Sequence, residues 1–596
     1  MSNMPYRPMP RQPEPLNANN RMALYFREES RLREKSSFRL ILLSLIFLMA
    51  FLLITLKLTF IAGSKVSISS GTYKMIREIE SRHDIVDRNG NILATNIPVN
   101  SLYAHPNKLL DAKFAAESLS LIFPEMKAEE VLRLFEKNPK FVFLKGSISE
   151  VEKNQILELG EPGLKFGDRE LRLYPNGPLL AHVLGRTQIK EMSSKDVRLE
   201  GVSGLEKMFD DTLKKYDFEQ KPLKLSIDLA TQSILEDVLS DGIDLFKAKG
   251  GTGIIMEVNN GEILGMVSFP NFDPNFKPES DKNSTDSKML FNKAVQGTYE
   301  LGSVLKIFTA AMAIELGAFS PHTMIDVSKP VKIGNTKPIK DKTWLGEKIP
   351  LKEVIAKSSN VGSARIISNF RPEEQKEFLE NLGFFEETGV ELPEANVKSS
   401  IGADPWTNYK AAMIAIGHGI RISPLHLATA YAISVNGGFK IKPTIIKGIN
   451  DNFLKKRVIS HDTSAKIIEI LGEVVNSGTG QNAQINGYSL GGKTGTAEKF
   501  DRGLGKFNFE KNYASFASFF PLNEPKYVVV ICLDEASNQY RKTNQRIAGN
   551  TAVPLAAEII SRVAPILGIM PEKHLNTAAD SYSNGLISDI SDLSNY

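Results

Sequence analysis

The sequence of 596 residues has very little cysteine: Cys532 is its only one. A single cysteine cannot form a disulfide within one chain, so cysteine usage does not indicate the redox compartment. Cys532 follows the apolar run 528–531, which predicts a small buried strand residue. The eight histidines are scattered without the spacing of metal ligands, so we predict no metal site.

Net charge is also small. The formal value is +4, which is too little to indicate nucleic-acid binding. Hydrophobic residues make up 42% of the chain and charged residues 24%, a balance typical of globular domains with large cores. The length of 596 residues indicates several such domains.

Only one long apolar run without charge is present, at residues 40–56, with Ser44 and Thr55 as its polar residues. About 20 residues span a bilayer core, so we predict a membrane anchor at 38–61. Basic residues outnumber acidic ones before it, which places residues 1–37 in the cytoplasm and the rest of the chain across the membrane. The alternative is a cleaved signal peptide, but its apolar core would be shorter, at about 7–15 residues.

Beyond the anchor, the pattern becomes regular from residue 223 onward. Asn260-Gly261 predicts a hairpin turn between two strands within 253–267. Strands at both ends of 223–568 with helices between them predict an α/β sandwich whose sheet joins distant parts of the sequence. The other predicted elements are a tight turn at 87–90, helix within 115–135 broken at Pro124, helices at 231–246 and 553–563, and adjacent strands at 514–520 and 527–533.

The first of three short polar clusters is Ser303-x-x-Lys306. Gly302 precedes the serine, and the almost wholly apolar run 307–316 predicts a buried helix with Ser303 at its positive N-terminus. A lysine three residues further on faces the same way. Buried there, it loses basicity and can accept the serine proton. The alternative is a serine that only caps the helix.

The second cluster is Ser358-Ser359-Asn360, after a predicted helical stretch at 351–357. Ser358 is a candidate proton shuttle between Lys306 and a leaving amine. Asn360 is a candidate hydrogen-bond partner for a substrate amide. The alternative is an ordinary helix cap.

The third cluster, Lys493-Thr494-Gly495-Thr496, is the most specific. Glycines before it suggest an edge strand beside a cleft, where a substrate backbone approaches closely. The lysine supplies positive charge, and the two threonine hydroxyls can bind a carboxylate. The alternative is a fragment of a phosphate-binding loop, although the glycine that such a loop requires upstream is out of frame.

The three clusters together describe a serine nucleophile, its activating lysine and a cationic slot for a carboxylate, which indicates acyl transfer. With this set the chain resembles the class B penicillin-binding proteins, which are monofunctional peptidoglycan D,D-transpeptidases. The resemblance runs from about residue 82 to 554 and includes the segments 82–90, 172–175, 182–185, 201–206, 225–228, 272–275, 416–419, 424–425 and 436–438.

Three residues depart from the family pattern beside the motifs. Leu301, Ala415 and His418 stand where the family usually has proline, serine and glutamine. These departures bear on the shape of the cleft and on drug affinity rather than on the reaction.

The resemblance implies an α/β fold, the penicillin-binding transpeptidase fold, with an antiparallel sheet sandwiched by helices. We expect this domain at 223–568, on an elongated α+β pedestal resembling a dimerisation domain at 62–222. A flexible tail at 569–596 completes the expected organisation.

The resemblance also implies roles for the site residues. Ser303 attacks the carbonyl between two D-alanines of a stem peptide. The terminal carboxylate of this peptide binds to Lys493, Thr494 and Thr496, on the strand that also contains Gly495. Backbone N–H groups of Ser303 and Thr496 form the oxyanion hole. An amine from a neighbouring strand then attacks the acyl-enzyme, and no cofactor is needed.

Other classes fit less well. About 160 residues at 62–222 leave no room for a glycosyltransferase domain, and a β-lactamase would need a deacylating base that we do not find. We therefore expect a slowly deacylating enzyme that β-lactams inhibit. The layout and residues 299–304 resemble the septal type, which implies an inner-membrane protein with its catalytic domain outside the cytoplasm and with other cell-division membrane proteins as partners. The elongation type and a non-catalytic scaffold remain alternatives.

Overall fold

The computed structural model describes residues 42–59, 82–193, 196–214, 221–276, 288–398, 400–401, 405–449, 456–501, 503, 506–537 and 546–572. It divides into two compact units, Met1–Ile79 and Glu80–Tyr596. The predicted cytoplasmic tail at 1–37 lies outside the described residues. So does the part of the predicted C-terminal tail, 569–596, that follows residue 572.

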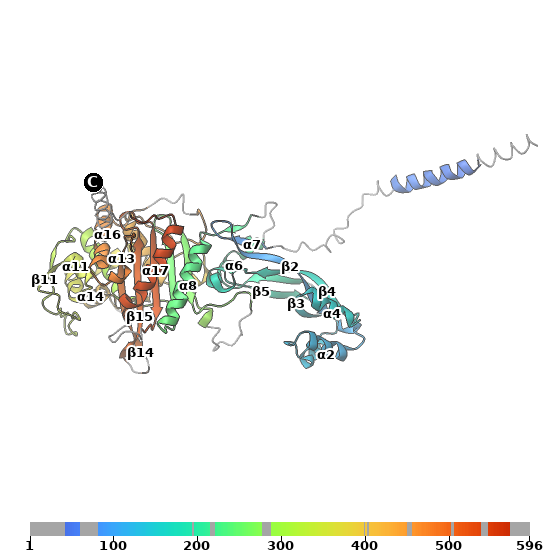
Figure 1. Ribbon diagram of the computed structural model, residues 1–596, viewed down its shortest axis with the longest axis horizontal. Helices are drawn as coiled ribbons and strands as arrows, with labels where there is room; N and C mark the ends of the chain where they lie inside the picture. Colours follow the sequence, from blue (N-terminus) through green and yellow to red (C-terminus); the bar gives the residue numbers. More distant parts are fainter. Residues whose placement is uncertain are drawn as a thin grey trace, which may run out of the picture. The chain divides into compact units, whose positions relative to one another are not determined.

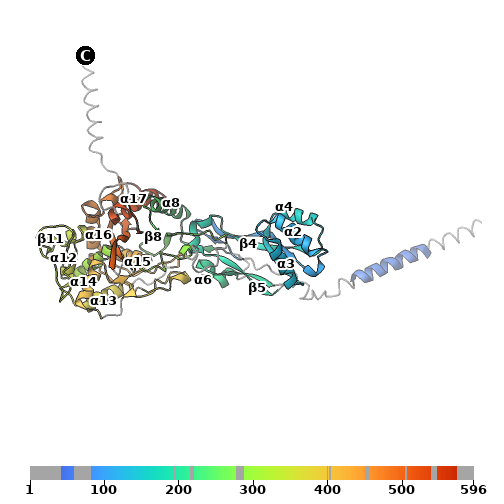
Figure 2. The ribbon, with the colours of Figure 1, turned by 90° about the horizontal axis from the view of Figure 1, so that it is seen from below.

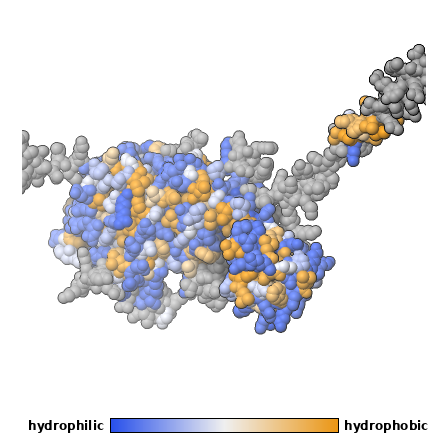
Figure 3. Space-filling view, turned by 45° about the vertical axis from the view of Figure 1, so that its right-hand side comes forward, coloured by the Kyte–Doolittle hydropathy of each residue, from blue (hydrophilic) through white to orange (hydrophobic). Residues whose placement is uncertain are grey.

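In the first unit, residues Leu42–Thr59 form one helix of 18 residues, long and apolar enough to cross a membrane. Its large apolar side chains are exposed, with Leu48 at 66% and Phe51 at 68%. They form the hydrophobic surface of this helix in Figure 3. The helix lies within the predicted anchor at 38–61, as a membrane-spanning segment requires.

The pedestal is built around the long strand β2 (Ile92–Ala104). This strand pairs antiparallel with β1 (Ile85–Val86), β3 (Val142–Ile148) and β4 (Leu164–Leu173), which confirms the turn predicted at 87–90. The helices α2 (Ala112–Ile122), α3 (Ala128–Lys137) and α4 (Glu150–Glu158) gather at one end of the sheet (Figures 1 and 2). The break at Pro124 separates α2 from α3, as predicted.

Three pedestal segments that carry the family resemblance meet in one buried ion cluster. Glu206, on α6 (Gly204–Met208), accepts hydrogen bonds from Arg82 Nε at 2.5 Å and Arg172 Nε at 2.7 Å. Arg82 Nη1 also contacts Asp210 Oδ1 at 2.7 Å. Glu206 and both arginines are almost completely buried. The cluster joins the start of the pedestal to the end of β4 and to α6.

The second part of this unit contains a five-stranded antiparallel sheet in the order β14-β15-β16-β8-β9. The strand β16 (Tyr527–Asp534) pairs with β15 (Lys506–Phe520) and with β8 (Gly250–Glu257), so the sheet joins distant parts of the sequence, as predicted. The predicted hairpin is formed by β8 and β9 (Ile263–Phe269). Cys532 is completely buried in β16, which also follows the prediction.

Helices cover both faces of this sheet. The helices α8 (Leu229–Leu245) and α17 (Ala552–Ile566) lie on one side of β8, and α15 (Pro424–Val435) lies on the other (Figure 2). Two separate cores of buried apolar residues fill the two faces. This arrangement confirms the α/β sandwich. The domain boundaries at 222 and 568 remain predictions.

The helix α10 (Lys306–Glu315) is buried on all sides from Lys306 to Ile314, as its apolar sequence predicts. The other α-helices and strands of the described ranges are α5 (Ala181–Leu184), β5 (Thr187–Ser193), β6 (Asp196–Gly201), α7 (Asp210–Lys214), β7 (Leu223–Lys224), β10 (Met324–Asp326), β11 (Lys348–Pro350), α11 (Leu351–Ala356), α12 (Asn360–Ile367), α13 (Pro372–Asn381), β12 (Ser400–Ile401), α14 (Asn408–Ile416), β13 (Ile420–Arg421), α16 (His461–Asn476) and β14 (Gly491–Asp501).

Candidate active site

Ser303 lies in the short 3-10 helix Gly302–Leu305, which leads directly into α10. Ser303 therefore lies at the N-terminal end of a buried helix, as predicted, and the first turn of this helix is 3-10 rather than α. In a 3-10 helix, residues three apart eclipse each other, so Ser303 and Lys306 project from the same side. Leu301 occupies the cap position of this turn, so the interpretation of Ser303 as a simple helix cap is wrong.

The Lys306 side chain is completely buried against the second motif. Its Nζ donates to Ser358 O at 2.6 Å, to Ser358 Oγ at 3.1 Å and to Asn360 Oδ1 at 2.6 Å. Burial holds the pKa of Lys306 well below its usual value, and the nearby charge of Lys493 lowers it further. The direction of this shift is the one that the sequence predicted for a buried lysine at this position.

The second motif both caps a helix and binds Lys306. The Ser359 hydroxyl caps α12 by accepting from Gly362 N at 2.8 Å, so the helix-cap interpretation holds for this residue. Ser358 has a left-handed backbone with φ of 59°, which is uncommon for a residue other than glycine. This bend lets both Ser358 and Asn360 contact Lys306.

The third motif lies on β14, the edge strand of the sheet, as predicted. A strand position excludes the phosphate-binding-loop interpretation, which requires a loop before a helix. A Cβ on Gly495 would come within 2.2 Å of Leu301 O, so only glycine lets this strand lie against the turn that carries Ser303. Gly302 also lies close to this strand, since a Cβ added to it would be 3.1 Å from Thr496 N.

Lys493, on the same strand, is completely buried. Its Nζ donates to Thr494 O at 3.1 Å, and burial lowers its pKa to about 7. Thr494 and Thr496 are fixed from outside the motif: Thr494 Oγ1 lies 2.6 Å from Thr479 Oγ1, and Thr496 Oγ1 accepts from Ala548 N at 3.0 Å.

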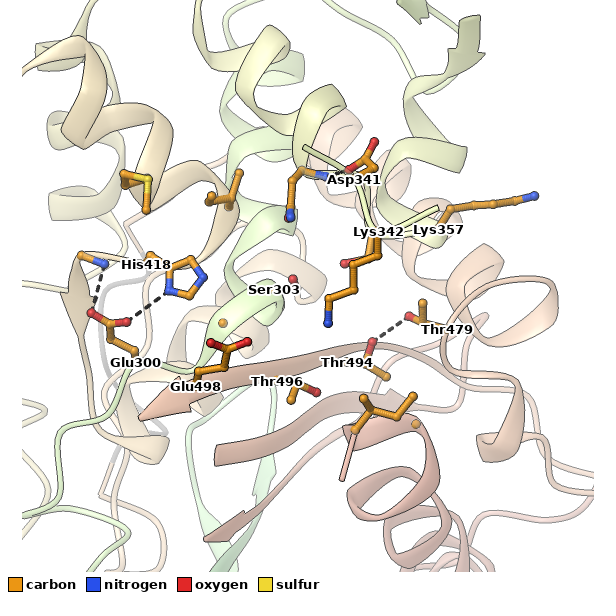
Figure 4. A pocket seen from close by; sticks show the side chains of 18 of the residues that line it. Glu300, Ser303, Asp341, Lys342, Lys357, His418, Thr479, Thr494, Thr496 and Glu498 are labelled. Atoms are coloured by element: carbon orange, nitrogen blue, oxygen red, sulfur yellow. Dashed lines mark hydrogen bonds and ion pairs between the residues drawn. The ribbon is translucent and has the colours of Figure 1, made fainter. Parts of the chain in front are cut away.

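All three motifs meet at a cleft of about 1200 Å³. Figure 4 shows Ser303 in the middle of this cleft, with Thr494 and Thr496 along one wall. Ser358 and Asn360 also line it, whereas Lys306 and Lys493 are buried behind its walls. The structure therefore brings together every motif that the sequence singled out. Within the described ranges, no cluster of three or more histidine, cysteine, aspartate or glutamate side chains is arranged to hold a metal.

Sequence reasoning missed several polar residues of the cleft. Glu300 Oε2 lies 3.2 Å from His418 Nδ1, and Glu300 Oε1 accepts from Gly419 N at 3.2 Å. Thr479 and Asp341 also line the cleft. His418 stands out in the sequence as a departure from the family pattern, and Glu300 lies in the segment 299–304 that resembles the septal type, but no sequence signal points to Thr479 or Asp341.

Comparisons with known proteins agree with this geometry. The penicillin binding protein transpeptidase domain matches residues 251–560, and the penicillin-binding protein dimerisation domain matches residues 79–217. The solved structure of penicillin binding protein 3 from Mycobacterium tuberculosis, complexed with aztreonam, is similar with a TM-score of 0.62 at 24% identity, over 82% of this chain and 97% of that chain.

Curated relatives extend along most of the chain. It is 34% identical to the probable peptidoglycan D,D-transpeptidase FtsI of Caulobacter vibrioides, over 85% of this chain and 84% of that protein. It is 29% identical to peptidoglycan D,D-transpeptidase FtsI of Buchnera aphidicola, over 90% and 96%. It is 28% identical to stage V sporulation protein D of Bacillus subtilis, over 90% and 87%. The chain belongs to the class B penicillin-binding proteins, the family of peptidoglycan D,D-transpeptidases.

Proposed function

We propose that this protein cross-links peptidoglycan stem peptides at the division septum through an acyl-enzyme on Ser303. One observation carries the proposal. The buried amino group of Lys306, held by Ser358 and Asn360, lies one 3-10 turn from a serine in an open cleft. A lysine with a depressed pKa is the base that a serine nucleophile needs.

In the acylation step, neutral Lys306 takes the proton of the Ser303 hydroxyl while Oγ attacks the carbonyl between the two terminal D-alanines. The C–N bond breaks, and the leaving amine takes a proton that Ser358 relays from Lys306. The products are an ester on Ser303 and free D-alanine, so atoms and charge balance.

The terminal carboxylate of the donor peptide binds on Thr494 and Thr496, with the charge of Lys493 behind them. Backbone N–H groups of Ser303 and Thr496 stabilise the oxyanion, each by about 3 kcal/mol in the transition state. The tight approach of Gly302 to the Thr496 backbone supports this pairing, because it brings the two N–H donors into one neighbourhood.

In the second step, an amine from a neighbouring strand attacks the ester carbonyl and releases Ser303. A β-lactam follows the same first step, but its ring-opened product stays attached, so it inhibits the enzyme. A purified protein supplied with a D-Ala-D-Ala donor peptide and an amine acceptor should release one D-alanine for each new amide bond. Ser303→Ala should release none, and D-alanine release by that variant would contradict the assignment.

We place the protein in the inner membrane, anchored by the helix of residues Leu42–Thr59 with its catalytic domain outside the cytoplasm. The names of the relatives in Caulobacter and Buchnera support the septal role, and we expect other cell-division membrane proteins as partners. Because one relative is a sporulation protein, other class B roles, including elongation, remain alternatives to the septal role. Depletion of the protein should give filamentous cells, whereas round cells would favour the elongation role.

A further inference from the structure

The connection between β10 and β11, residues 327–347, forms one margin of the cleft. Three of its residues line the cleft: Lys342, Thr343 and Leu345. Figure 4 shows Lys342 on the opposite side of the cleft from Thr494. The connection contains five lysines, against Asp341 and Glu347 as its acidic residues. This margin of the cleft therefore carries a net positive charge.

Two of the lysines lie together on the outer face of the connection. Val331 and Ile339 exchange backbone hydrogen bonds at 3.1 and 2.8 Å, and both side chains pack against the core. Neighbouring residues of paired strands point to the opposite face, so Lys332 and Lys340 face outward as diagonal neighbours, roughly 7–8 Å apart. Both lysines are exposed. In the part of the chain that the structure describes, neither side chain is in an ion pair.

Trp344, on the same connection, leaves its indole ring in water. It is 70% exposed, whereas the next residue, Leu345, packs against the core. The other tryptophan, Trp406, is partly buried and donates to Gln375 Oε1 at 3.0 Å. Packing within the fold therefore does not account for the position of Trp344. An indole combines an apolar face with a polar N–H, which suits contact with a sugar ring.

We propose that this basic outer face, made of Lys332, Lys340 and Trp344, binds the glycan strand whose stem peptide occupies the cleft. Trp344 stacks on a sugar ring, and the two lysines attract the terminal carboxylates of neighbouring uncross-linked stem peptides. The inference deepens the proposed function and rests on it.

Two observations favour this occupant. The positive charge of the face complements a strand that carries one carboxylate at the end of each uncross-linked peptide. The face is also continuous with the cleft, because Thr343 and Leu345, on either side of Trp344, both line it. A strand attached to a peptide in the cleft thus reaches the face without a second binding event.

The test titrates the full-length protein, in detergent, with soluble, fluorescently labelled, uncross-linked peptidoglycan strands and follows their anisotropy. Trp344→Ala should raise the dissociation constant about threefold to tenfold, and so should the double variant Lys332→Gln/Lys340→Gln, through the loss of a stacking contact or of two surface ion pairs. Acylation of Ser303 by a fluorescent penicillin should stay within about twofold of the wild type, because these side chains do not line the cleft.

Matched controls test whether any exposed aromatic ring or lysine pair would give the same result. Phe276→Ala removes a side chain that is 71% exposed, and Lys137→Gln/Lys376→Gln removes two exposed lysines. None of these residues lines the cleft, so the dissociation constant should not change. An equal loss in the controls, an unchanged dissociation constant in both test variants, or a matching fall in penicillin acylation would overturn the proposal.

Tryptophan emission adds a signature of stacking, since the chain has two tryptophans. Strand binding should change the emission of the wild type, and Trp344→Phe should bind nearly as tightly without that change. An emission change that persists in Trp344→Phe would contradict the stacking contact.

Strands with amidated carboxylates separate charge from stacking. They should bind the wild type and the lysine double variant equally weakly, and Trp344→Ala more weakly still. If the test variants instead lose binding to vesicles of anionic phospholipid and keep binding to strands, the face is a membrane contact and the proposal is wrong. Failure of the wild type to label at Ser303 would contradict the proposed function itself.

Discussion

Two regions of this molecule, the pedestal and the active site, bury ionisable side chains, but only the pedestal pairs them with opposite charges. In the pedestal, the carboxylate of Glu206 lies between the guanidinium groups of Arg82 and Arg172. In the active site, Lys306 and Lys493 are completely buried, and their hydrogen bonds go to neutral oxygens. Paired charges join parts of a fold, whereas desolvated ammonium groups hold their protons weakly and can take part in chemistry.

The comparison predicts that each region fails differently when a charge is removed. Loss of a pedestal charge should reduce stability and leave the chemistry of the folded protein intact. Loss of a buried active-site lysine should abolish or slow the chemistry without loss of stability. Four substitutions test this contrast, from the largest expected effect to the smallest.

Lys306→Met should lower the rate of penicillin acylation by about 10⁴-fold or more, because the serine loses its base. The melting temperature should stay the same or rise, since a desolvated ammonium group is no longer buried. Stopped-flow labelling and thermal unfolding measure the two effects. Lys352→Met, on the outer part of α11, is the control and should label normally. Labelling of Lys306→Met at more than a tenth of the wild-type rate would remove the lysine from the mechanism.

Glu206→Gln should reduce the free energy of unfolding by about 3–5 kcal/mol, because it leaves the buried Arg172 guanidinium without a counter-charge and Arg82 with Asp210 alone. The folded fraction should still label at the wild-type rate. Urea denaturation measures the loss, with Glu130→Gln as a control in an exposed ion pair. An unchanged unfolding midpoint would show that the buried ion cluster does not stabilise the pedestal.

Lys493→Met should slow acylation by roughly a hundredfold, because the carboxylate slot loses its charge. It should also raise the melting temperature at pH 6, by about 2–4 °C for each kcal/mol by which the free energy of unfolding increases. The pKa of Lys493 is lowered to about 7 in the fold, so the unfolded chain binds a proton more tightly than the folded one. Wild-type stability should therefore increase as pH rises above 7, and a lower melting temperature of the variant would contradict this sign.

Asp210→Asn should reduce the free energy of unfolding by about 1 kcal/mol, the smallest effect of the four. Burial raises the pKa of Asp210, but hydrogen bonds from Lys214, the Gly201 N–H and Arg82 outweigh it, so the pKa is lowered. Its stabilising effect is present above its unfolded pKa and is lost as pH falls through the lower folded value. The difference from the wild type in urea denaturation should thus narrow between pH 5 and pH 3, and a constant difference would exclude an electrostatic origin.

The sequence predicted most of the fold because its cues are local. Asn260-Gly261 marks the hairpin of β8 and β9, and the apolar run after Lys306 marks the buried helix α10. The three motifs also predicted the main site residues, and the structure brings them to one cleft.

The rest depends on contacts between distant segments, which spacing does not reveal. Asp341 contacts the second motif across 18 to 20 residues, which include β11 and α11. Thr479 reaches Thr494 from the end of another helix, and Glu300 contacts His418 118 residues away. The close contact between the turn at Ser303 and β14 is another such contact, which the local sequence does not reveal.

The central claim is that a serine beside a desolvated lysine forms the acyl-enzyme. Its most direct test is intact-mass measurement and peptide mapping after incubation with a β-lactam, for the wild type and for Ser303→Ala. The account predicts one long-lived covalent adduct on the peptide that contains Ser303, and none in the variant, which should melt like the wild type. An adduct that persists in Ser303→Ala, or a folded wild type that forms none, would contradict it.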